Sequence, residues 1–372
     1  MRPSLPALPT AFGVFGMVWG GWQAVLPDLA DRYGLSSGPL GAMLTAGFAI
    51  SLPAMLATGR LLDSAGTGRG MAVTAICMAA GLAVVATLGS LPFLVLGVIL
   101  FVVGSGAFDV AINGAALGDE TWSRPARLTL LHAAFSAGGM IGAVGGGVAI
   151  GSGIAFQAVY VFLAGCLLLA AGALASSRWR HTSTGGAVPR SVALAMLPLA
   201  ALAGLAFRAE GSMETWSAIY LRDELGAAAL VGALGPAAFH AAMFVGRLVG
   251  AGVAGWLGAP TTLLVGGVMT LIGMAAALLV TEPVAAIPAM AVAALGASFV
   301  VPVVVSLAAR RAGAHAGRAA SYVLTLGYAG FLVGPSLVGI GGELVGLRTA
   351  LIVVPVAAAL IALGSRTSVA RV

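Results

Sequence analysis

The sequence contains no lysine and few charged residues of any kind, since only 8% of its 372 residues are charged. Soluble domains carry about 25% charged residues, so this chain has too little polar material to cover a water-facing surface. Hydrophobic residues make up 60% of the chain, and the mean hydropathy is +1.07. The composition excludes an ordinary soluble domain. It predicts an all-α integral membrane protein, because a backbone in lipid must satisfy its hydrogen bonds within each segment.

The sequence also lacks the clusters that most enzymes and metalloproteins need. Its two cysteines, Cys77 and Cys166, lie in separate apolar runs without a C-x-x-C partner. We therefore expect no disulfide, no metal and no cofactor. No H-E-x-x-H motif or Walker phosphate loop is present, which argues against an intramembrane metalloenzyme and an ATP-driven pump.

The net charge of +6 comes from 18 basic residues, all of them arginine. These arginines are scattered between apolar runs and do not cluster with aromatic residues on one face. The pattern predicts a lipid bilayer as the partner and no nucleic acid, because basic residues concentrate in cytoplasmic loops of membrane proteins.

Apolar runs separated by polar residues, glycine or proline predict twelve transmembrane helices of roughly 20 to 25 residues each. The run after Arg2 continues through Trp19 and Trp22 without a small-residue cleavage site, so we interpret it as the first helix and not as a signal peptide. The predicted spans are 10–30, 38–58, 69–89, 92–116, 129–150, 154–176, 193–221, 228–250, 258–280, 284–308, 317–341 and 345–365.

The distribution of arginine predicts the orientation. With the N-terminus inside, only three arginines fall in external loops, namely Arg32, Arg222 and Arg348. The cytoplasmic segments then hold Arg2, Arg60, Arg69, Arg124, Arg127, Arg178, Arg180, Arg190, Arg310, Arg311, Arg318, Arg366 and Arg371. This asymmetry predicts that both termini are cytoplasmic, with an even number of spans, in a multi-pass protein of a bacterial cytoplasmic (inner) membrane.

A polar segment near the midpoint divides the chain into an N-terminal six-helix bundle (1–176), a cytoplasmic linker (177–192) and a C-terminal six-helix bundle (193–372). Parallel repeats of this kind occur in membrane transporters. Two sets of residues suggest such a repeat. Trp22 and Gly41 match Trp216 and Gly235 at an offset of 194, while Gly138 and Gly142 match Gly330 and Gly334 at an offset of 192.

The segment after the second span carries glycines, one aspartate and arginines: Gly59, Arg60, Asp63, Gly66 and Arg69. The glycines predict a tight turn, and the carboxylate suits a helix N-terminus or an arginine partner. The pattern resembles the cytoplasmic gating-loop signature of the major facilitator superfamily. The match is partial, since the basic residue usual after the aspartate is replaced by Ser64.

Three further pieces resemble the fucose-permease-like branch of that superfamily and its uncharacterised bacterial members. They are Asp109–Asn113 through Glu120, the span-five segment 132–138, and the span-seven segment 210–216. The resemblance implies the major facilitator fold and, by analogy with fucose-type permeases, proton symport.

Asp109 and Asn113 are four residues apart, so they share one face of a helix. A charge within a membrane span is costly and usually faces a cavity or a partner. We interpret Asp109 as a site for a proton or for the solute; the alternative is a structural hydrogen bond between helices.

Glu210 and Glu214 repeat this spacing in span seven, where two nearby carboxylates titrate as a coupled pair. Arg208 lies two residues before Glu210 and must find a partner on another helix or extend to the membrane surface. Glu214 can instead lie at the external boundary and be solvated.

Other polar and aromatic residues are weaker candidates. His132 is either a proton relay or a structural residue, and His240 is a packing residue in our interpretation. Arg247 in span eight suits a gate or an interface between helices. Trp19, Trp22, Gln23 and Trp216 either anchor spans one and seven at the membrane interface or line a central cavity.

Together these features predict a monomeric secondary transporter that carries a small polar solute, such as a sugar, with protons by alternating access. The alternative keeps the fold and reverses the direction, giving proton-driven efflux of a drug-like compound or metabolite.

Overall fold

A computed structural model describes residues 7–119, 122, 125–176, 179 and 189–367. All regular elements among these residues are helices. Most of the expected linker lies outside the described residues, as do five of the arginines used above to predict orientation: Arg2, Arg124, Arg178, Arg180 and Arg371.

The first half contains six long helices. They are α1 (Ala7–Tyr33), α2 (Ser37–Ala65), α3 (Thr67–Thr87), α4 (Leu91–Gly118), α5 (Pro125–Gly151) and α6 (Phe156–Ala175).

The second half repeats this order with short interruptions in several spans. Its first three spans are α7 (Arg190–Ile219) with the π-helical turn η1 (Tyr220–Glu224), α8 (Ala229–Leu257) and α9 (Ala259–Leu279). The last three spans are each divided into shorter segments. The fourth consists of α10 (Pro283–Ser298) and α11 (Val300–Ala312). The fifth consists of α12 (Ala316–Gly327), preceded by the short turn η2 (Gly313–His315), and α13 (Ala329–Val345), and the sixth of α14 (Leu347–Ala350) and α15 (Val353–Thr367).

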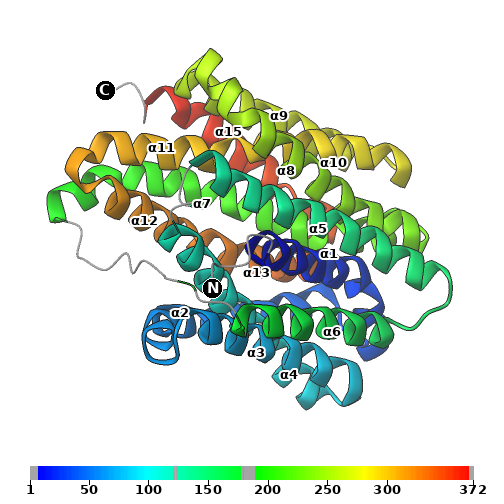
Figure 1. Cartoon of the computed structure of the whole chain (residues 1–372). Helices are drawn as coiled ribbons and strands as arrows, with labels where there is room; N and C mark the ends of the chain where they lie inside the picture. The colour runs from blue at the N-terminus through cyan, green and yellow to red at the C-terminus, as the bar shows by residue number, and fades with distance from the viewer. Residues whose placement is uncertain (1–6, 120–121, 123–124, 177–178, 180–188, 368–372) are drawn as a thin grey trace.

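Among the described residues, eleven helical segments are long and apolar enough to cross a membrane. Helix α1 is not one of them, but it has 27 residues and packs along α5 within the bundle. It completes the predicted set of twelve, arranged as two bundles of six (Figure 1).

One part of the prediction is wrong. Gly59, Arg60 and Asp63 are not in a loop, because α2 continues to Ala65. Only Gly66 makes the turn, with a φ of +84°, and α3 begins one residue later. Arg60 and Asp63 are exposed on the last turns of α2, where charged side chains reach water without ending the helix.

The helices define two end faces. We call the end at which α2 meets α3 and α11 meets α12 the linker face, and the other end the far face. Helix α1 begins and α15 ends toward the linker face, on the left of Figure 1. This arrangement agrees with the even number of spans that the arginine pattern predicts.

Turn glycines at both ends establish the internal repeat. Gly34 and Gly226 follow the first span of each half at the far face, with φ of +60° and +69°. Gly66 and Gly258 follow the second span, with φ of +84° and +76°. Both pairs are 192 residues apart (226 − 34 and 258 − 66), and only glycine adopts this backbone conformation without strain.

Helix contacts show the same register. In the first half, a methyl group on Gly138 would lie 1.9 Å from the carbonyl oxygen of Gly13, so α5 and α1 meet backbone to backbone. In the second half, a methyl group on Gly330 of α13 would lie 2.2 Å from the carbonyl oxygen of Gly204 of α7. Small residues permit this close approach in membranes.

The expected match at an offset of 194 is therefore out of register. Gly41 of α2 contacts Gly339 of α13, and the symmetric contact joins Ala233 of α8 to Gly147 of α5. Gly41 thus corresponds to Ala233 at an offset of 192 (233 − 41), not to Gly235. By the same offset Trp22 corresponds to Glu214, so its match with Trp216 is a coincidence of sequence.

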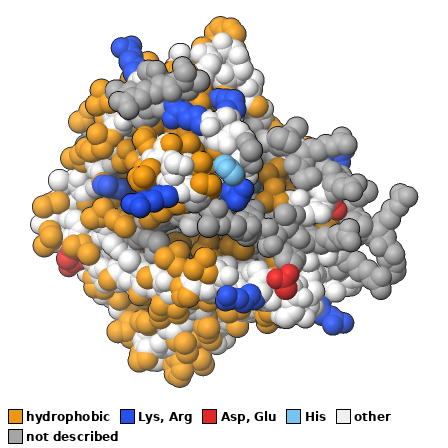
Figure 2. Space-filling view, turned by 90° about the vertical axis from the view of Figure 1, so that its left-hand side faces the viewer, with side chains coloured by type: hydrophobic (Ala, Val, Ile, Leu, Met, Phe, Trp, Pro, Cys, Tyr) orange, Lys and Arg blue, Asp and Glu red, His pale blue; other side chains and the backbone are white. Residues whose placement is uncertain are grey.

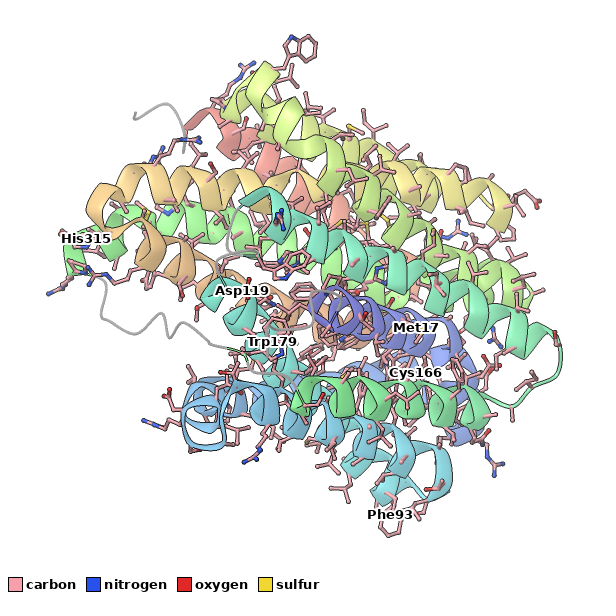
Figure 3. All side chains as sticks on the ribbon, viewed as in Figure 1. Met17, Phe93, Asp119, Cys166, Trp179 and His315 are labelled. Carbon is pink, nitrogen blue, oxygen red and sulfur yellow. The ribbon has the colours of Figure 1, made fainter. Side chains whose placement is uncertain are left out.

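The surface is typical of a protein in lipid. Large apolar side chains such as Leu56, Trp256 and Leu279 are about four-fifths exposed, and Phe93 points away from the bundle in Figure 3. Arginine side chains are spread over the linker face in Figure 2, where hydrophobic side chains form much of the rim.

Candidate functional site

Asp109 joins the two halves in the middle of the bundle. Its Oδ1 accepts a hydrogen bond from the Asn113 amide at 2.9 Å, and that amide also donates to the Asp109 carbonyl. Its Oδ2 accepts one from the Tyr328 hydroxyl at 3.2 Å. Tyr328 lies between α12 and α13 in the other half, so the half-buried carboxylate faces the space between the bundles.

Aromatic residues of both halves lie near this part of α4. Trp19 of α1 donates from its indole to the Ser105 hydroxyl at 3.0 Å, one helical turn before Asp109 on α4. Tyr328 stacks on Phe207 of α7, with ring centroids 4.8 Å apart and planes inclined by 20°. Tyr328 of the second half thus contacts the carboxylate, and Trp19 of the first half contacts α4 one turn away.

A second polar cluster joins α1, α7 and α8. The Gln23 side chain is hydrogen-bonded to Glu214 and lies 3.2 Å from Nε2 of His240. The same His240 nitrogen is 3.8 Å from Oε1 of Glu214. The histidine ring is 1% exposed and lies against Gly139, where a methyl group would come within 2.5 Å of it.

Arg247 connects the second cluster to the first half. Its guanidinium donates to the carbonyl of His132 at 2.7 Å and to the Ser136 hydroxyl, both on α5. It also lies in electrostatic range of Glu210 and Glu214. Glu210 is 7% exposed, and no hydrogen bond to its carboxylate is found among the described residues. Two carboxylates therefore lie in the field of one partly buried guanidinium.

The structure thus gathers Asp109, Asn113, Glu210, Glu214 and Gln23 near the boundary between the halves. His132 takes part through its main chain, while its ring lies edge-on to Phe12 with centroids 5.4 Å apart. The residues expected to form a gating loop lie at the linker face, and only Arg247 of that group reaches the center.

Two tryptophans do not anchor the helices at the membrane interface. Trp22 is 1% exposed and stacks between Phe101 and Tyr160, with centroids 4.6 and 5.1 Å away. Trp216 is fully buried, and its ring packs against Gly339 of α13. Trp19 is only partly buried. The Nε atom of Arg208 is buried without a hydrogen-bond partner in the described chain.

The two halves also meet at the far face. Arg222 pairs with Asp28 at 2.5 Å and with Asp31 at 3.5 Å. Glu343 of α13 accepts a hydrogen bond from the main chain of Gly38, at the start of α2, at 3.1 Å. About two turns further in, the hydroxyls of Thr45 and Ser336 are hydrogen-bonded. By contrast, α11 packs mainly on α7, α9 and α12 of its own half.

Sequence reasoning missed three contributors. Tyr328 and Ser136 were given no role of their own, and Arg222 was counted only as an external loop charge. The only available signal was that Arg222 and the two aspartates are external charges of opposite sign, which did not show that they pair across the halves.

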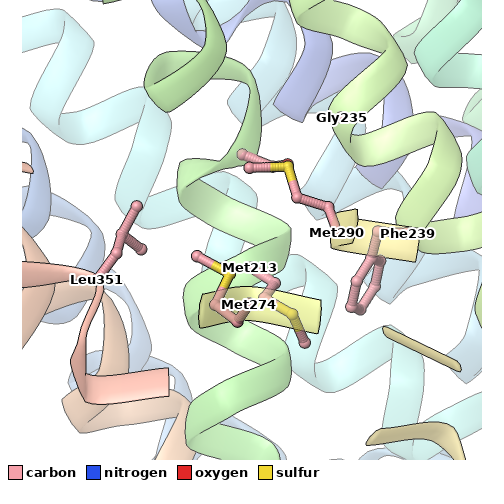
Figure 4. Close-up of a pocket in the computed structure, with 7 residues that line it drawn as sticks. Met213, Gly235, Phe239, Met274, Met290 and Leu351 are labelled. Carbon is pink, nitrogen blue, oxygen red and sulfur yellow. The ribbon is translucent and has the colours of Figure 1, made fainter. Parts of the chain in front are cut away.

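A separate pocket lies wholly within the second half. Met213 and Ser217 of α7, Phe239 of α8, Met274 of α9 and Met290 of α10 contribute to its lining (Figure 4). Its lining residues all belong to the second half, so it is an intrabundle pocket and lies apart from the boundary at which Asp109 meets Tyr328.

Comparison with known proteins agrees with this architecture. The profile of the Major Facilitator Superfamily matches residues 9–335. An uncharacterised MFS-type transporter of Yersinia pestis is 29% identical over 346 residues, which cover 91% of this chain and 89% of that protein.

Solved structures share the fold. A point mutant of the nucleoside transporter NupG aligns with a TM-score of 0.78 at 12% identity, covering 98% of this chain and 99% of that one. A point mutant of the fucose:proton symporter FucP of E. coli aligns with a TM-score of 0.65 at 17% identity, covering 97% of each chain.

Proposed function

Because the chain belongs to the Major Facilitator Superfamily and is a membrane transporter, we propose that it imports a small polar solute together with protons by alternating access. The orientation that fits this proposal places the linker face, and with it both ends of the chain, in the cytoplasm. The contacts across the far face then close the external side, and the bundle opens inward.

The observation that carries the proposal is the group formed by Glu210, Glu214 and Arg247. A charge in the center of a membrane helix costs roughly 2.5 to 3.5 kcal/mol on insertion scales. Arg247 compensates one carboxylate, and a second negative charge in the same low-dielectric site is neutralised most simply by a proton. The pair titrates as a unit. We assign the proton to this pair, and specifically to the more buried Glu210.

We assign Asp109 a different role, that of sensing the bound solute. It is more exposed than Glu210, it faces the boundary between the halves, and its hydroxyl donor Tyr328 belongs to the opposite bundle. A group that both halves contact is suited to report whether a solute is bound, because the halves must move relative to each other during transport.

The experiment uses purified protein in proteoliposomes and the solute that stabilises it most in a thermal-shift screen of sugars, amino acids and drug-like compounds. Glu210→Gln removes the titrating group and keeps the side-chain size. Exchange at equal solute concentrations is expected to survive, whereas accumulation driven by a pH gradient is lost. Glu282→Gln, at an exposed position before α10, is the matched control. Normal accumulation by Glu210→Gln contradicts the assignment of the proton.

Proton-driven efflux is the second candidate. The same proteoliposomes distinguish the two: an inward-directed proton gradient drives solute in during symport and out during antiport.

A further inference from the structure

We infer that the solute site at Asp109 recognises an organic ammonium group, so that the transported solute is a small organic cation. This inference rests on the proposed transport function and names the solute class that the site would take.

The first observation is the hydrogen bonding of the carboxylate. Both of its oxygens face donors, Asn113 at Oδ1 and Tyr328 at Oδ2. An ionised carboxylate only accepts hydrogen bonds, whereas a protonated one must also donate. The surroundings of Asp109 therefore accommodate the anionic form, with a donor available to each oxygen.

The second observation is that Asp109 has no cationic partner among the described residues. The other two carboxylates near the boundary have a cationic group nearby. Glu210 and Glu214 lie in electrostatic range of Arg247, and Glu214 also lies 3.8 Å from His240. The chain has no lysine to contribute. An anion held between two membrane bundles requires a positive charge, which a cationic solute supplies.

The third observation is the replaceable donor. A hydroxyl bonded to a carboxylate usually lies 2.5–2.7 Å from it, but the Tyr328 oxygen is 3.2 Å from Oδ2. Asn113, in contrast, lies on the same helix and fixes the carboxylate orientation. An ammonium N–H can take the place of the tyrosine hydroxyl while the asparagine contact stays.

The fourth observation is the aromatic surroundings. The stacked rings of Phe207 and Tyr328 belong to the second half, and Trp19 of the first half contacts α4 one turn from the carboxylate. Aromatic faces attract ammonium groups. A carboxylate beside aromatic rings thus recognises both the charge and the alkyl part of an organic cation.

The test measures binding to the purified full-length protein in detergent, by thermal shift and by titration calorimetry. The probes are matched cationic and neutral pairs: choline with 3,3-dimethylbutan-1-ol, glucosamine with glucose, and benzylamine with benzyl alcohol. We expect the cation of at least one pair to bind while its neutral partner does not. Asp109→Asn is expected to weaken that binding by roughly tenfold or more, since a hydrogen bond to a charged group is lost.

Two further variants make the result independent of misfolding. Asp109→Glu keeps the charge and is expected to retain the preference for the cation, and Tyr328→Phe is expected to bind it at least as tightly as the wild type. No preference for the cation in any pair overturns the inference, and so does unchanged cation binding by a folded Asp109→Asn variant. Neither result affects the assignment of the proton to Glu210, which is read from transport and not from binding.

Discussion

Tyr328 and Asp109, separated by 219 residues in sequence, are joined by a hydrogen bond of 3.2 Å that crosses the boundary between the two bundles. Each group lies within a span, at the boundary between the two halves. Opening the bundles apart must break this bond, so its strength contributes directly to the balance between the conformations.

Replacing Tyr328 by Phe removes the hydroxyl and leaves the ring stacked on Phe207. We expect ligand-free protein to lose about 0.5–1.5 kcal/mol of stability, the net value of one hydrogen bond. Thermal unfolding in detergent measures this loss. Tyr322→Phe in α12 is the control, because no hydrogen bond of the Tyr322 hydroxyl is found in the described structure. Equal effects of the two variants would show that the bond to Asp109 contributes nothing.

The sequence predicted the helices well, and the reason is physical. Each span is an apolar run in the sequence, and eleven of the twelve are recognised as membrane spans from helix length and hydropathy alone. The prediction was less accurate at helix ends. Helix α2 continues through Arg60 and Asp63 because charged side chains can reach water from a helix end, so polarity does not mark where the helix stops.

The sequence predicted several residues of the site but not which of them contact one another. Asp109 and Glu210 stood out because charges are rare in membrane spans. Tyr328, the partner of Asp109, did not stand out, because its role depends on which helices adjoin. Those helices are more than 100 residues apart in sequence, and no local pattern encodes a contact such as that between His240 and Gln23.

Close helix packing gives a second prediction. Gly138→Ala places a methyl group against the backbone of α1, where 1.9 Å is available. The helices must separate, and we expect a loss of about 1–3 kcal/mol, typical of overpacking. Gly145→Ala on the same helix is the control, because no atom lies within 4 Å of its new methyl group. There we expect no loss, since alanine favours a helix over glycine by about 1 kcal/mol. Equal melting temperatures for the two variants would contradict the packing described here.

The orientation gives a third prediction. A reporter fused after residue 180 or at the C-terminus is expected in the cytoplasm. Reporters inserted near Asp31 or Glu224, at the far face, are expected outside. The physical reason is the arginine asymmetry, with Arg60, Arg69 and Arg127 among the arginines of the linker face. A paired phosphatase and fluorescent-protein fusion at each site measures it. Fluorescence from the insertion near Asp31 would reverse the proposed topology and the direction in which the bundle opens.

The last prediction concerns the contacts that close the far face. Arg222, in the turn η1, reaches Asp28 and Asp31 at the end of α1, and its side chain is 17% exposed. Such partly exposed pairs contribute about 1 kcal/mol or less. That value changes the equilibrium between two conformations by up to roughly fivefold. Arg222→Gln is therefore expected to raise the fraction of molecules open at the far face without unfolding the protein.

A cysteine in place of Ser336 measures that opening. Its hydroxyl bonds to Thr45 across the halves, so a thiol at this position is covered when the far face is closed. In a background with Cys77 and Cys166 replaced by serine, a membrane-impermeant maleimide added from the far side should label Arg222→Gln faster than the parent, by up to about fivefold. Arg32→Gln removes a charge from the same face, where Arg32 is exposed and pairs with no acid in the described chain. It should label at the parent rate. If the two variants label equally fast, the pairing of Arg222 with Asp28 does not hold the face closed, and closure rests on the contacts of α2 with α13.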